Sequence, residues 1–137
     1  MNSNSSCGAG GNGRSYIGSM NAKFYLNGAV THTFEATSIY FNDRAFSGSK
    51  GGETIYMTYP ERVLEGVYEF DYVDGDGGGG YHLQYSSGSK AYGLTGKVRV
   101  AASNNGDVQE GSISATFESD GRVISVEATF TGVYSFP

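Results

Sequence analysis

The last third of the chain alternates apolar and polar residues on both sides of an Asp-Gly pair, and this pattern constrains the fold most. Residues 112–118 and 124–131 alternate in this way, and Asp120-Gly121 lies between them. Alternation with period two is typical of a strand with one buried face, and Asp-Gly is a favoured two-residue hairpin turn because it accepts positive φ. The predicted register pairs Ser119 with Arg122, Phe117 with Ile124, Ala115 with Val126 and Ile113 with Ala128.

A second hairpin is expected around Asn27-Gly28. A two-residue turn there would place apolar residues of the first strand opposite Ala29 and Thr31. A three-residue loop over 26–28, with Gly28 in the left-handed region, gathers the apolar residues on one face instead. We therefore expect the three-residue loop. The predicted register pairs Phe24 with Val30, Ala22 with His32 and Met20 with Phe34.

Segments 67–73 and 81–86 are expected to form a third hairpin, because aromatic residues and leucine alternate with polar residues in both. Symmetric pairing places Asp71 across from His82. A carboxylate beside an imidazole orients the ring and favours its charged form, so this pair is a candidate for acid–base chemistry. The plainer interpretation is an exposed cross-strand pair worth under about 1 kcal/mol. The same pairing sets Tyr72 beside Tyr81, Phe70 beside Leu83 and Tyr68 beside Tyr85.

Further strands are expected at 36–42, 53–59 and 95–102, which makes about eight in all, and no stretch supports a helix. The sequence predicts an all-β fold, a single antiparallel β-sandwich. A small up-and-down or lipocalin-like β-barrel is the alternative, since both alternate in the same way. We interpret residues 1–15, which include Cys7, as a disordered Gly/Ser/Asn-rich tail, and 16–137 as the β-sandwich domain.

Charge and hydropathy exclude several classes of protein. The net charge is -5 without a basic cluster, which argues against nucleic-acid binding. No apolar run reaches the roughly 18 residues of a transmembrane segment. No apolar region typical of a signal peptide precedes Cys7, so the expected location stays open between the cytoplasm and export.

The glycine-rich loop that begins at Asp74 is a candidate calcium site. Asp74 and Asp76 offer carboxylates, and the glycines that follow offer carbonyl oxygens. The loop lacks the further acid of an EF-hand and occurs once, so it does not form a calcium-binding repeat. A soluble hairpin loop without a cofactor is the plainer interpretation.

Tyrosine is the remaining signal of a binding surface. Tyrosine offers a stiff apolar face and a hydroxyl group, which suits recognition. The alternative is that these side chains fill a thin core in a chain without Trp. The candidates for ligand binding lie in the middle third of the chain: Tyr56, Tyr59, Tyr81, Tyr85 and Tyr92.

Several short motifs resemble those of small bacterial exported or lipoprotein-type β-sandwich domains of unknown function. They are Gly66-Val67-Tyr68-Glu69-Phe70, Tyr81-His82-Leu83-Gln84-Tyr85, Gly96-Lys97-Val98-Arg99-Val100, Gly111-Ser112-Ile113-Ser114-Ala115-Thr116-Phe117 and Val126-Glu127-Ala128-Thr129-Phe130-Thr131-Gly132. The resemblance implies a β-sandwich and a place in the cell envelope. It implies no catalytic residues.

We therefore expect a non-enzymatic binding or interaction module that presents loops or a tyrosine-rich sheet face to a protein or a glycan. One alternative is a β-barrel carrier of a small apolar ligand. A second is a small hydrolase or lyase, which requires His32 or His82 beside acids in a concave site. The outward threonines of the last hairpin, Thr116, Thr129 and Thr131, also suggest a homodimer formed through a sheet edge.

Overall fold

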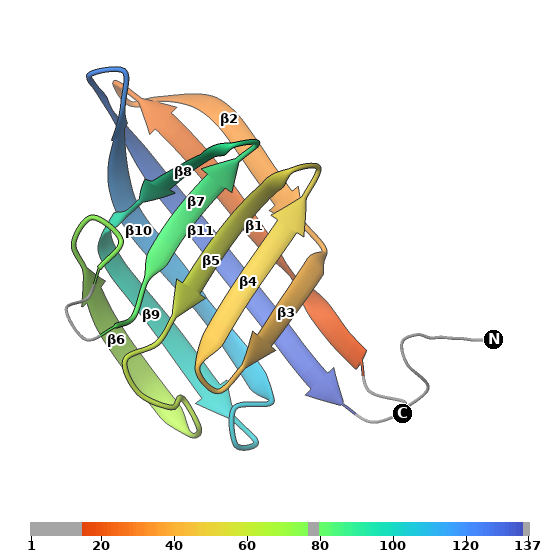
Figure 1. Ribbon diagram of the computed structural model, residues 1–137. Helices are drawn as coiled ribbons and strands as arrows, with labels where there is room; N and C mark the ends of the chain where they lie inside the picture. The colour runs from red at the N-terminus through yellow and green to blue at the C-terminus, as the bar shows by residue number, and fades with distance from the viewer. Residues whose placement is uncertain (1–14, 77–79, 136–137) are drawn as a thin grey trace.

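The computed structural model describes residues 15–76 and 80–135, and these form two antiparallel sheets packed face to face (Figure 1). The described residues contain no helix, and the sheets do not close into a barrel. The predicted β-sandwich is therefore confirmed and the barrel alternative is wrong. Most of the predicted tail, with Cys7, lies outside the described residues, and the first strand begins at Ser15.

The described residues form eleven strands, where about eight were expected. The six-stranded sheet has the order β2 (Ala29–Ala36), β1 (Ser15–Leu26), β11 (Arg122–Ser135), β10 (Val108–Ser119), β9 (Thr95–Ser103) and β6 (Gly66–Tyr72). The five-stranded sheet has the order β3 (Ser38–Asn42), β4 (Ala45–Lys50), β5 (Glu53–Thr58), β7 (Leu83–Ser87) and β8 (Lys90–Gly93). The sequence analysis missed β4 and β8, whose small and polar residues alternate weakly.

The last hairpin has the predicted register. Ser119 pairs with Arg122 across the Asp120-Gly121 turn, and Phe117 pairs with Ile124. Both turn residues have positive φ, 54° and 76°. However, β10 and β11 each have a neighbour on both sides, so this hairpin offers no free edge to a second copy. A homodimer through a sheet edge stays a prediction, and it would have to use β2, β6, β3 or β8.

The predicted register of the first hairpin is wrong. Asn27-Gly28 forms a two-residue turn with φ of 53° and 81°, and a bulge follows at Thr31. The bulge adds one unpaired residue to β2, and this brings the apolar residues of the strand onto the buried face. The three-residue loop was expected to have the same effect. His32 consequently lies opposite Phe24 rather than Ala22, and it is exposed. The other pairs are Ala22 with Phe34 and Met20 with Ala36.

The predicted third hairpin is also wrong. β6 pairs with β9 in one sheet, whereas β7 pairs with β5 and β8 in the other. Asp71 therefore lies opposite Lys97, with 3.3 Å between Oδ1 and Nζ, and not across from His82. The alternation in 67–73 and 81–86 is compatible with a hairpin. Instead, the first segment pairs with β9 and the second with β5, and both partners are more distant in the sequence. Tyr72 and Tyr81 still meet, edge to face, between the sheets.

The core lies between the two sheets and is rich in aromatic rings. Phe46 stacks on Phe41 and touches Phe130 of the opposite sheet. In β9, Val98 and Val100 point into the core. None of the described residues belongs to a helix of the length and apolarity that crossing a membrane requires.

Candidate functional site

An aromatic depression is lined by residues of β1, β3 and β11 and of the turns that follow β3 and β9. The start of β1, the ends of β3 and β11 and the turn from β9 to β10 lie at one end of the sandwich (Figure 1). The volume of the depression is about 330 Å³, at the lower end of the range for small-ligand pockets. We call it the tyrosine end. Its lining residues are Tyr16, Tyr40, Phe41, Asn42, Asp43, Asn105, Asp107 and Tyr134.

Three tyrosine rings form the apolar wall of the tyrosine end. The ring centroid of Tyr16 lies 5.2 Å from that of Tyr40 and 4.7 Å from that of Tyr134. Tyr16 also touches Phe41 edge to face, at 5.5 Å. Tyr40 is 53% exposed and Tyr16 is 36% exposed, so both rings present apolar surface to solvent. The rings are tilted against one another, so their faces are not hidden in a parallel stack.

A pair of glycines brings the rings together. Gly18 of β1 lies opposite Gly132 of β11. A Cβ atom at Gly132 would lie 2.6 Å from Cε1 of Phe41, and one at Gly18 would lie 2.7 Å from Cδ1 of Ile39. The missing side chains let β3 approach the six-stranded sheet closely, and this places Tyr40 beside Tyr16.

The turn after β9 supplies polar groups to the same end. Asn104 and Asn105 have positive φ, 53° and 57°, as does Gly106 at 86°. Buried Gln109 holds the turn in place, because its Nε2 donates to the carbonyl oxygen of Gly106 at 3.0 Å and to that of Asn42 at 2.8 Å. The turn is thereby fixed against the end of β3.

The two carboxylates of the tyrosine end differ in their partners. Oδ2 of Asp43 accepts a hydrogen bond from Nε of Arg62 at 2.7 Å, so its charge is balanced. Asp107 is exposed, and its carboxylate forms no ion pair with a described residue. Its backbone carbonyl accepts from the N–H of Tyr134 at 2.8 Å, which fixes its position beside the rings.

The tyrosines singled out from the sequence lie elsewhere. Tyr59 is buried, and its hydroxyl donates to Oε1 of Gln109 at 2.9 Å, so it supports the turn from the core. Tyr85 is buried as well, and Tyr81 and Tyr92 pack partly buried against the core. Only Tyr56 among the five is substantially exposed, at 39%.

The sequence did not lead to a prediction for Tyr16, Tyr40 or Tyr134, although alternation indicated that Tyr40 is exposed. Tyr40 stands between Ile39 and Phe41 in the expected strand 36–42, so it had to face outward. Tyr16 and Tyr134 stand close to the two chain ends. Nothing local in the sequence indicates that these two residues pair with each other.

The candidate calcium loop begins as a tight turn. Val73 and Asp76 exchange backbone hydrogen bonds around Asp74-Gly75, where both φ values are positive. The hydroxyl of Thr95 accepts from the N–H of Asp74 at 2.7 Å, which ties the turn to the start of β9. Residues 77–79 lie outside the described residues. The described ranges hold no group of three or more His, Cys, Asp or Glu side chains suited to a metal ion, and calcium binding stays a prediction.

A second polar cluster joins the two sheets near the opposite end. Nε2 of His32 lies 2.6 Å from Oε1 of Glu53, and the hydroxyl of Tyr85 donates to the same oxygen at 2.7 Å. Burial, together with this hydrogen bond, raises the pKa of Tyr85 to about 12. His32 also packs on Phe24, with 5.2 Å between the ring centroids. We call His32, Glu53 and Tyr85 the latch, because they link the two sheets. Their polar groups are hydrogen-bond partners of one another.

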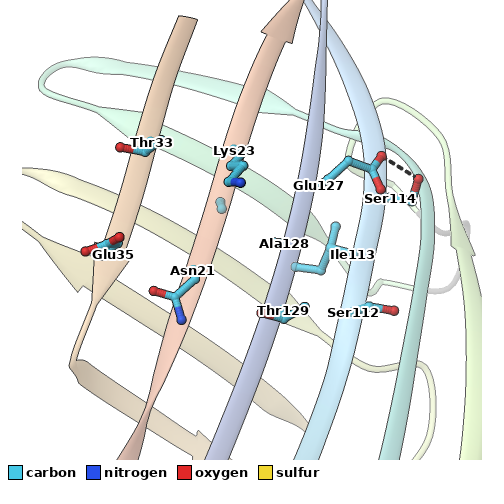
Figure 2. Close-up of a pocket in the computed structure, with 11 residues that line it drawn as sticks. Asn21, Lys23, Thr33, Glu35, Ser112, Ile113, Ser114, Glu127, Ala128 and Thr129 are labelled. Atoms are coloured by element: carbon cyan, nitrogen blue, oxygen red, sulfur yellow. Dashed lines mark hydrogen bonds between the residues drawn. The ribbon is translucent and has the colours of Figure 1, made fainter. Parts of the chain in front are cut away.

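Another depression, of about 350 Å³, lies on the outer face of the six-stranded sheet (Figure 2). Hydroxyl and amide side chains from four strands line it, and the Ser114 hydroxyl donates to Glu127 at 2.7 Å. Lys23 lies opposite Glu127 in the register. None of the described residues that line it is aromatic, so it offers no ring face on which a ligand could stack.

No family model, no curated protein and no solved structure matches the chain. The resemblance to small bacterial exported β-sandwich domains therefore stays a prediction.

Proposed function

We propose that the protein is a non-enzymatic binding module that takes a glycan at the tyrosine end. The observation that carries this proposal is the tilted cluster of Tyr16, Tyr40 and Tyr134 beside exposed amide and carboxylate groups. A sugar ring has an apolar face of C–H groups and a rim of hydroxyls. A tyrosine ring complements the face, and Asn and Asp side chains complement the rim.

The polar groups of the site support a glycan over a purely apolar ligand. The side-chain amide of Asn105 offers donors and an acceptor, and the carboxylate of Asp107 adds acceptors. The amide oxygen of Asn42 already accepts from the N–H of Arg44 at 2.8 Å, so Asn42 offers mainly its NH₂ donors. An apolar ligand would displace water from these exposed groups without replacing its hydrogen bonds, which is unfavourable.

The chemistry of the lining also favours binding over catalysis. The described residues around the depression include no histidine, serine or cysteine. Glycoside hydrolysis uses a pair of carboxylic acids, and of the two carboxylates here Asp43 is already paired with Arg62. The histidine that does lie beside a carboxylate, His32, is held in the latch with Glu53 and Tyr85. The proposal therefore assigns recognition, and no reaction, to this end of the molecule.

The test is an oligosaccharide array that carries neutral, acidic and amino sugars, followed by calorimetry on the sugars that bind. Tyr40→Ala removes an exposed ring and is expected to weaken binding at least about tenfold, because exposed aromatic anchors carry much of the binding energy at recognition sites. Tyr25→Ala is the matched control. Tyr25 is a partly exposed tyrosine at the far end of β1, and its loss should leave affinity unchanged.

Two results would overturn the proposal. The first is that the folded wild-type protein binds no oligosaccharide of any class at millimolar concentration. The second is that Tyr40→Ala and Tyr25→Ala bind the sugar as tightly as the wild-type protein does. Circular dichroism of each variant establishes that the sheets are intact.

A further inference from the structure

We infer that the glycan bound at the tyrosine end carries a free, positively charged amino group, as glucosamine units do; this inference rests on the proposed function. The first observation is the unequal state of the two carboxylates. Arg62 already balances Asp43, whereas Asp107 faces the depression without a cationic partner among the described residues.

The second observation is the arrangement of the rings that line the same depression as Asp107. Tyr16 and Tyr134 lie with 35° between their planes, and Tyr16 and Tyr40 with 58°. The face of an aromatic ring carries negative potential and attracts an ammonium group within about 6 Å of its centroid. The tyrosine rings and the carboxylate of Asp107 therefore both attract a positive charge.

The third observation concerns the cations that are missing from the lining. Neither lysine nor arginine is among the described residues around the depression. An acidic sugar would thus bring its carboxylate beside Asp107 without a counter-charge, and like charges repel at short range. The overall charge of -5 adds to this preference for a cationic ligand.

An amino sugar satisfies all three observations. Its ring lies against a tyrosine, and its ammonium group donates to the carboxylate of Asp107 in a charge-assisted hydrogen bond. Acetylation of the amine keeps the sugar ring and removes the charge. The free and the acetylated sugar therefore form a matched pair of ligands that isolates the contribution of the charge.

The experiment is calorimetry with a glucosamine tetrasaccharide and an N-acetylglucosamine tetrasaccharide, at about pH 6. This pH lies below the pKa of about 8 that an amine beside electron-withdrawing groups shows. Wild-type protein is expected to prefer the free amine at least about tenfold, and the preference should shrink as salt is added. Asp107→Asn should remove the preference while keeping the shape of the site.

Asp120→Asn is the control variant, because Asp120 is an exposed turn residue with a φ of 54°, which Asn also adopts. It should keep the preference. Equal affinity for the two sugars, or tighter binding of the acetylated one, would overturn the inference and leave the proposed function standing. A preference that survives in Asp107→Asn would overturn it as well. Failure of every oligosaccharide on the array would instead overturn the proposed function itself.

Discussion

Gly18 and Gly132 lie opposite each other on neighbouring strands, and the edge strand of the other sheet packs into the space that their missing side chains leave. Phe41 fills the space over Gly132, and its ring stacks on Phe46 in the core. The same contact holds Tyr40 beside Tyr16. This glycine pair therefore couples the packing of the two sheets to the shape of the tyrosine end.

Replacing Gly132 by alanine is expected to lower the free energy of unfolding by about 1–3 kcal/mol. The new Cβ atom would lie 2.6 Å from Cε1 of Phe41 and 3.0 Å from Cε2 of Phe46, so two packed core rings would have to move. Urea unfolding followed by circular dichroism measures the change. Thr131→Ala alters the neighbouring, outward-facing residue and should stay within about 0.5 kcal/mol of wild type. A fully stable Gly132→Ala variant would contradict the close approach of β3.

Tyr56 is expected to matter for long glycans and not for short ones. Tyr40, Ser47 and Tyr56 lie in one row across β3, β4 and β5, and the small Ser47 leaves a gap between the two exposed rings. Adjacent strands lie about 4.8 Å apart, so the two tyrosines are about 10 Å apart, which is the span of two sugar units. Tyr56→Ala should weaken binding of a hexasaccharide several-fold and leave a disaccharide unaffected in calorimetry. Equal losses for both lengths would refute the extended row.

The sequence predicts the fold well where partners are neighbours along the chain. The Asp120-Gly121 hairpin forms in the predicted register, because turn chemistry and alternation there specify the same pairing. The prediction fails for 67–73 and 81–86, where alternation was compatible with a hairpin but long-range pairing with β9 and β5 prevails. Alternation states which face of a strand is buried. It does not state which strand lies beside it.

The candidate site was harder to predict for the same reason. It gathers Tyr16, Tyr40, Asp107 and Tyr134 from four separate parts of the chain. Their proximity depends on the glycine pair and on the turn fixed by Gln109, and both are tertiary contacts. The sequence indicated tyrosine as the recognition residue. However, two of the tyrosines predicted to bind, Tyr59 and Tyr85, are buried in the core.

Stability is expected to fall steeply in alkaline solution. Burial raises the pKa of Tyr59 and Tyr72, and burial with a hydrogen bond to Glu53 raises that of Tyr85 to about 12. Unfolded tyrosine titrates near pH 10, so the folded chain binds more protons than the unfolded chain above that pH. The stabilisation is complete below about pH 10 and is lost as the pH rises toward about 12. Urea unfolding at several pH values across this window measures the loss.

Tyr85→Phe is the variant that checks this cause. It removes one of the three hydroxyls that resist ionisation, so its stability should decline less between about pH 10 and about pH 12. A decline equal to that of the wild-type protein would show that Tyr85 does not contribute. The absorbance of tyrosinate gives an independent measure of when the buried rings ionise.

Removal of the Glu53 carboxylate should loosen the latch between the sheets. Glu53→Ala leaves the partly buried hydroxyl of Tyr85 without its acceptor and His32 without its ion-pair partner, and we expect a loss of about 1–2 kcal/mol. Glu69→Ala is the control, since its pair with Arg99 is solvent-exposed and spans 3.8 Å. That variant should change stability by less than about 0.5 kcal/mol. Equal effects of the two substitutions in urea unfolding would contradict the structural role of the latch.

The most direct test of glycan binding at the tyrosine end is a nuclear magnetic resonance titration of isotope-labelled protein with the glucosamine tetrasaccharide and its acetylated form. The backbone amide signals of Tyr16, Tyr40, Asn105 and Asp107 and the ring signals of the two tyrosines are expected to shift with added sugar, while those around Lys23 and Glu127 on the outer face stay in place. Signals that remain unchanged with both sugars, or shifts that gather around Lys23 and Glu127, would contradict the assignment of the site.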